Sequence, residues 1–150
     1  MFEETFGVKF LYVTFVSAAV AALLTAAVPY DAKTMFERTS PSLAKMTYER
    51  EGNMVVMTIT ASGIPNGAST AADCAIMIRG LQGGDDVVRG EVVPWFSSTT
   101  QVTSADIGPD AIRVDVLVGP EGARVTDHGA AAKLCGLGSQ LDGLYQRVPG

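Results

Sequence analysis

The sequence contains few of the residues that build catalytic centres. It has one histidine, His128, and two cysteines among 150 residues. A histidine-based metal site normally recruits several His, Cys or carboxylate ligands at helical or turn spacing, and a Ser-His-Asp or Cys-His site would also have to use His128. We therefore predict no catalytic residue, no metal ligand and no cofactor, and expect His128 to be an ordinary surface histidine.

Charged side chains are scarce as well, and the sequence contains no cluster of Lys and Arg. They make up 18% of the chain, against about 25% in ordinary soluble proteins, and the net charge is −5. Binding to nucleic acid needs clustered Lys and Arg, because the affinity comes from releasing counterions of the phosphates. This composition excludes nucleic acid as an expected partner and favours a domain that covers part of its surface with other proteins.

A long apolar run is present near the N-terminus. Residues 10–30 contain no charged side chain, and Lys9 and Asp31 bracket them. At about 1.5 Å per residue a helix of this length spans roughly 30 Å, the hydrocarbon thickness of a bilayer. The run predicts a transmembrane helix over 10–30, preceded by a short tail over 1–9 and inserted in the lipid bilayer.

Two alternatives to a retained anchor stay open. A cleaved signal peptide has a basic start and an apolar stretch of about 7–15 residues, whereas this chain begins with two Glu and one Lys and its apolar run is longer. A buried core helix is the other alternative, although such helices are rarely so long and so uniformly apolar.

Small side chains recur at a spacing of four along this run. Spacing of that kind lets a second membrane helix approach closely, so we expect contacts with other integral membrane proteins. An alanine-rich helix facing lipid is the alternative. The residues expected to pack are Ser17, Ala18, Ala21, Ala22 and Ala26.

Two signals disagree on the compartment of the domain that follows. Lys and Arg are more numerous after the apolar run than before it, which favours the cytoplasm. Cys74 and Cys135 are the only cysteines, and a single distant pair suits one disulfide in an oxidising compartment, although two buried thiols would fit as well. On balance we expect a single-pass membrane protein whose domain is periplasmic or extracellular, with a disulfide between Cys74 and Cys135.

The remaining sequence divides into a connector over 31–45 and one domain over 46–150. Alternating apolar residues around Glu51-Gly52-Asn53 predict a hairpin over 46–62. Strands are also predicted over 87–96 and 111–118, the latter forming a hairpin with 123–126. Pro94 suggests an edge or a bend, because proline cannot donate to a strand ladder.

Two segments predict helices. Thr70 and Asp73 have capping-box spacing, and the residues that follow place Cys74, Met77 and Ile78 at helical spacing. The first helix is therefore expected over 71–82, with a short strand as the alternative. The second is a broken helical region over 128–147, weakened by three glycines. The fold class expected is α+β, a transmembrane helix followed by a small domain with an antiparallel sheet and one or two helices.

Trp95 and Phe96 form the aromatic pair of the domain. Packing in the core is one role for them, and anchoring a protein interface is the other.

These features lead us to expect a non-catalytic accessory or structural subunit of a multi-subunit membrane complex, whose domain braces its partners. Respiratory and photosynthetic complexes are examples that contain such subunits, although no residue of this chain points to either. One alternative is a pilin-like or virion-like structural subunit that assembles with itself. The other is a membrane-tethered binding module or an enzyme with an unrecognised site.

Overall fold

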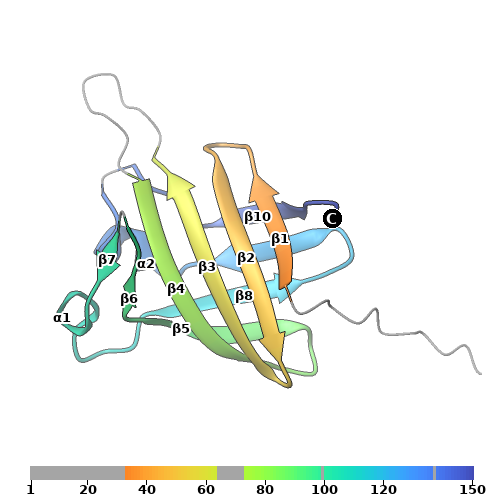
Figure 1. Ribbon diagram of the computed structural model, residues 1–150, viewed down its shortest axis with the longest axis horizontal. Coiled ribbons are helices and arrows are strands. Elements are labelled where there is room, and N and C mark those ends of the chain that lie inside the picture. The colour runs from red at the N-terminus through yellow and green to blue at the C-terminus, as the bar shows by residue number, and fades with distance from the viewer. Residues whose placement is uncertain (1–32, 64–72, 99, 137) are drawn as a thin grey trace, which may run out of the picture.

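The chain folds into a closed antiparallel β-barrel (Figure 1). The computed structural model describes residues 33–63, 73–98, 100–136 and 138–150. Around the barrel the strands follow the order β1-β10-β9-β8-β5-β4-β3-β2. Strands that are consecutive in the ring are therefore also neighbours along the chain, apart from the closing pair β1–β10 and an insertion between β5 and β8.

The elements in chain order are β1 (Lys33–Arg38), β2 (Ala44–Glu51), β3 (Met54–Ser62), β4 (Asp73–Gln82), β5 (Val87–Val93), β6 (Trp95–Phe96), β7 (Gln101–Val102), α1 (Ser104–Ile107), β8 (Arg113–Val118), β9 (Gly122–Thr126), α2 (Ala130–Leu134) and β10 (Gly143–Arg147).

Alternation of side chains along the strands explains the barrel. Successive residues of a strand point to opposite faces of a sheet, and here the residues of one parity are buried throughout. In β3, for example, Val55, Met57 and Ile59 are fully buried, whereas Thr58 between them is only half-buried. Large side chains of other strands, such as Tyr48 and Tyr145, also point inward and fill the interior together with the buried residues of β3.

Two opposed glycines allow β4 and β5 to approach closely. Gly80 lies opposite Gly90 in the register of the two strands. A Cβ atom on Gly80 would stand 2.6 Å from the Cα atom of Gly90, which is too close for any side chain. These two facing inward positions therefore carry no side chain, and the two backbones come close together there.

The insertion between β5 and β8 consists of the β6–β7 ribbon and α1, which lie together beside β4 (Figure 1). Thr103 caps α1 in a capping box: its side chain accepts a hydrogen bond from the Asp106 amide, and the Asp106 carboxylate accepts one from the Thr103 amide. Val102 and Ile107 are buried and bind the insertion to the apolar core.

The strand predictions are largely confirmed. β2 and β3 pair around the expected turn, where Gly52 has a φ of +62°. β8 and β9 form the second predicted hairpin. Residues 33–38, within the predicted connector, form β1, and a cis Ser40-Pro41 peptide follows this strand.

The predicted α+β class is wrong, because the described part of the domain is mostly strand and contains only two short helices, α1 and α2. Residues predicted as a helix over 71–82 form β4 from Asp73 onward. This strand is paired on both sides, with β3 and with β5. Its inward residues Cys74, Ile76 and Ile78 alternate at a period of two, and this pairing outweighs the local helical spacing.

The helical region predicted over 128–147 is also wrong for most of its length. Among the described residues of this region only Ala130–Leu134 is helical, and Gly143–Arg147 is the last strand of the barrel. Gly143 has a φ of +134°, a conformation that a helix does not contain and that other residues rarely adopt.

The predicted transmembrane helix over 10–30, with its tail over 1–9, lies outside the described residues. In the part of the chain that the structure describes, no helix is both long and apolar enough to cross a bilayer. The predicted single-pass anchoring therefore has no structural support, and we correct it.

Candidate functional site

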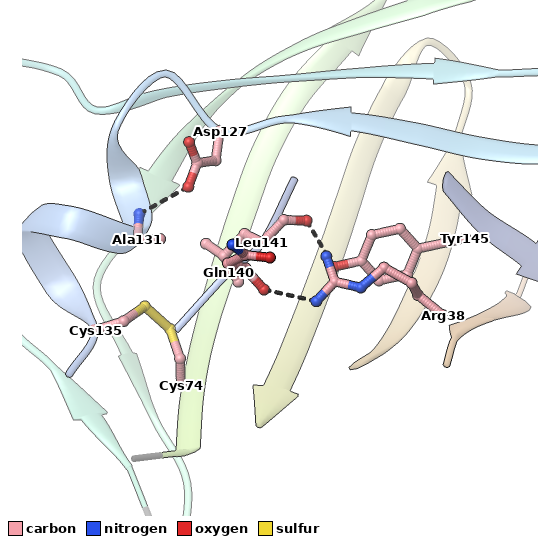
Figure 2. The surroundings of a disulfide bond; sticks show 8 residues. All are labelled: Arg38, Cys74, Asp127, Ala131, Cys135, Gln140, Leu141 and Tyr145. Atoms are coloured by element: carbon pink, nitrogen blue, oxygen red, sulfur yellow. Dashed lines mark hydrogen bonds between the residues drawn. A yellow bond between two sulfur atoms is a disulfide. The ribbon is translucent and has the colours of Figure 1, made fainter. Parts of the chain in front are cut away.

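One end of the barrel is closed by α2 and the residues that follow it. β1, β3 and β9 end here, and β4 begins here. Cys74, in β4, and Cys135, directly after α2, form the predicted disulfide. Figure 2 shows that this bond ties α2 to the barrel wall. The expected pairing of the two cysteines is confirmed.

Arg38 lies inside the same end with its guanidinium almost fully buried. It donates hydrogen bonds to the backbone carbonyls of Ser42, Gln140 (2.8 Å) and Asp142, and to the Ser42 hydroxyl. Its guanidinium carbon also lies 5.2 Å from the centre of the Tyr145 ring, a distance typical of a cation–π contact. Arg38 therefore joins the β1–β2 loop to the segment leading into β10. Figure 2 shows its hydrogen bond to Gln140 in that segment.

Asp127 and Asp142 hold the backbone around α2. The buried Asp127 carboxylate accepts hydrogen bonds from the amides of Gly129 (2.9 Å) and Ala131 (3.0 Å). The Asp142 carboxylate accepts one from the Asp127 amide at 2.6 Å. Three of these carboxylate oxygens are thus engaged with backbone donors, which indicates a structural role for both acids.

A pocket of about 620 Å³ opens beside this network. Small side chains and backbone make up most of its wall, and the two carboxylates are its charged groups. Its described lining residues are Asp127, Gly129, Ala131, Ala132, Cys135, Gly136, Gly138, Ser139, Gln140 and Asp142. No group of three or more His, Cys, Asp or Glu side chains able to hold a metal ion occurs within the described ranges.

Tyr145 completes the network at the barrel axis. Its hydroxyl donates to the Leu141 carbonyl at 2.8 Å, and its ring is fully buried. Burial raises the pKa of the Tyr145 phenol to about 12 from its usual 10.0, although the Arg38 guanidinium acts in the opposite direction.

Tyr145 should make the free energy of unfolding depend on pH in the alkaline range. The unfolded chain ionises this phenol near pH 10.0, whereas the folded chain keeps it neutral until about 12. The stability it contributes is therefore complete below pH 10 and is lost as the pH rises to 12, by about 2–3 kcal/mol. Urea unfolding across this range should show a steeper decline for the natural chain than for Tyr145→Phe, and equal slopes would contradict the assignment.

The predicted aromatic pair lies on the outside of the molecule. In β6, Trp95 is half-buried and Phe96 is 65% exposed, so Phe96 projects from the insertion rather than packing in the core. Other large apolar side chains are also exposed on the barrel: Met35, Leu43, Met54, Leu81, Leu117, Leu144 and Val148.

The remaining predicted residues divide between described and undescribed parts. The helix-packing set Ser17, Ala18, Ala21, Ala22 and Ala26 lies outside the described residues. His128 is exposed, as expected, with its Nε2 atom 2.9 Å from an Asp115 carboxylate oxygen. Sequence reasoning missed Arg38, because nothing local marks a single arginine as buried; its strand parity with the buried Phe36 was the available signal.

No known protein family matches the sequence, and neither the characterised proteins nor the solved structures include a significant match to it.

Proposed function

We propose that this protein is a non-catalytic structural subunit that assembles with other protein chains through the outer surface of its barrel and of the β6–β7 insertion. The observation that carries the proposal is the set of large apolar side chains on that surface, with Phe96 the most exposed of them. Aromatic residues are enriched among the side chains that dominate binding at protein interfaces.

The arrangement of the barrel end supports the same function. The buried polar groups there, Arg38 and Asp127, hold backbone segments together. The interior of the barrel is filled by packed side chains, including Tyr48 and Met57. These features make the barrel a rigid support and leave its outer surface for contacts with partners.

Gentle extraction from the native source, followed by native-gel separation and mass spectrometry, tests the proposal. We expect the chain to migrate in a complex of fixed composition. Migration as a monomer would contradict a structural role in an assembly.

Phe96→Ser refines that experiment. Removing the exposed ring should weaken the complex, because the ring would lose apolar area buried at the interface. Leu43→Ser makes the corresponding change at an exposed apolar residue of the β1–β2 loop, and shows whether that part of the surface also belongs to the interface. A complex that is unchanged by Phe96→Ser would remove Phe96 from the interface.

A further inference from the structure

The segment between β9 and β10 is attached to the barrel at separate places. Near its start, the buried Asp127 carboxylate accepts a hydrogen bond from the Ala131 amide, and near its end Arg38 donates to the Gln140 carbonyl (Figure 2). The disulfide lies between these two attachments, at Cys135. Because neither hydrogen bond involves a cysteine, both can hold the ends of the segment when the bond between the sulfur atoms is broken.

The far end of α2 depends mainly on the disulfide. A helix of five residues is little more than one turn and is not stable without outside contacts. Ala131, near its start, is buried, whereas Lys133 is exposed and Leu134 is only half-buried. Within the described ranges, the bonds from residues 132–135 to other elements are the disulfide and a hydrogen bond of 2.6 Å from the Lys133 Nζ atom to the Ile107 carbonyl.

The two cysteines differ in their access to solvent. Cys74 is 3% exposed and belongs to the core, whereas Cys135 is half-buried and lines the pocket of about 620 Å³. Thiol–disulfide exchange begins when a thiolate reaches one of the two sulfur atoms, so access decides which sulfur is attacked. The remaining walls of the pocket are mostly small side chains and backbone, which leave room for a thiol beside Cys135.

We propose that the Cys74–Cys135 bond is a redox-sensitive switch, which a dithiol reduces by attack at Cys135 and which then releases the end of α2 without opening the barrel. The inference concerns the closed end of the barrel and is independent of the proposed function.

The exchange proceeds in two steps. A thiolate of the dithiol attacks the Cys135 sulfur, the bond to Cys74 breaks, and the Cys74 sulfur leaves as a thiolate that takes up a proton. The second thiol of the reductant then loses its proton and displaces the Cys135 sulfur, which takes up a proton as well. The protein disulfide has gained two electrons, and the dithiol has been oxidised to a disulfide.

Reduction is expected to act locally. The barrel is closed by backbone pairing between its strands, for example of β1 with β10 and of β3 with β4, and α2 takes no part in this pairing. Elements with few buried contacts open at a lower free-energy cost than paired core strands. The end of α2 should therefore detach while the strands stay paired, so that Cys74 and Leu134 become accessible.

Hydrogen exchange of the purified full-length chain, with and without dithiothreitol, tests the inference. The amides of Lys133 and Cys135 donate to the carbonyls of Gly129 and Ala131. Their exchange should become about tenfold faster or more on reduction, because these hydrogen bonds lose the covalent support of the helix end. The Ala131 amide, which is bound to Asp127, and the amides of β3 should keep their rates.

Two variants separate the disulfide from other causes. Cys74→Ser/Cys135→Ser without dithiothreitol should exchange like the reduced natural chain. Lys133→Gln removes the hydrogen bond to the Ile107 carbonyl but keeps the disulfide, and its oxidised form should retain slow exchange in α2. Fast exchange in oxidised Lys133→Gln would assign the support of α2 to Lys133 and overturn the inference. Unchanged exchange on reduction would also overturn it, as would faster exchange throughout β3, because the bond would then hold the whole barrel.

A second measurement identifies the sulfur that is attacked. The oxidised chain is exposed briefly to glutathione, quenched with acid and alkylated, and its peptides are identified by mass spectrometry. We expect glutathione on Cys135 in about tenfold or greater excess over Cys74, since the Cys74 sulfur is shielded by the core. Comparable modification of the two cysteines, an excess on Cys74, or modification of neither would overturn attack at Cys135.

Discussion

Unfolding the Cys74→Ser/Cys135→Ser double variant should require about 3–4 kcal/mol less free energy than unfolding the natural, oxidised chain. The disulfide closes a loop between residues separated by 61 positions, and a loop of that length loses much of its conformational entropy in the unfolded state when it is closed. Urea unfolding of the two proteins under non-reducing conditions measures the difference.

Reduction provides the matched comparison for the double variant. The natural chain unfolded in the presence of a dithiol should approach the stability of the double variant, whereas the double variant should not respond to the dithiol. A loss below about 1 kcal/mol in both experiments would show that the other contacts of α2 hold the barrel end without the bond.

Replacing Arg38 by methionine should lower the free energy of unfolding by about 3 kcal/mol or more. Methionine keeps much of the apolar stem, but the carbonyls of Ser42, Gln140 and Asp142 lose their guanidinium donors. A buried acceptor without a partner costs about 1–3 kcal/mol, and the cation–π contact with Tyr145 is lost as well.

Arg113→Met is the control for this substitution, because it makes the same chemical change at an exposed strand position. Surface substitutions of this kind usually change stability by about 0.5 kcal/mol or less. Similar losses for Arg38→Met and Arg113→Met would show that the carbonyl contacts of Arg38 contribute little.

The two hairpin predictions, which depended on local turn signals, were confirmed. The β2–β3 hairpin has turn residues between two alternating segments, and the β8–β9 hairpin has the same arrangement. In each hairpin the turn residues and the alternating segments lie within a few residues of one another. The hairpin can therefore be predicted without knowledge of the rest of the chain.

The helix predictions were wrong for segments whose structure depends on contacts with residues distant in the sequence. In β4, Cys74, Met77 and Ile78 have helical spacing, but Cys74, Ile76 and Ile78 also alternate as in a strand. Only the pairing of β4 with β3 and β5 selects the second pattern. Closure of the barrel likewise depends on β10, which was predicted as helix.

The candidate site was predicted in part. The two cysteines were paired correctly because they were the only candidates for each other. Arg38 was not predicted as part of the site, because its burial depends on the carbonyls of Gln140 and Asp142, which are distant in the sequence.

Closure between the first and last strands has a consequence for synthesis. Phe36 of β1 pairs with Arg147 of β10, so the ring stays open until nearly the whole barrel sequence has been made. At about 5–20 residues per second, β1 waits on the order of ten seconds for its partner. During that time the apolar faces of the earlier strands remain exposed. A growing chain with this topology therefore has to avoid aggregation with other unfinished chains until its last strand has been synthesised.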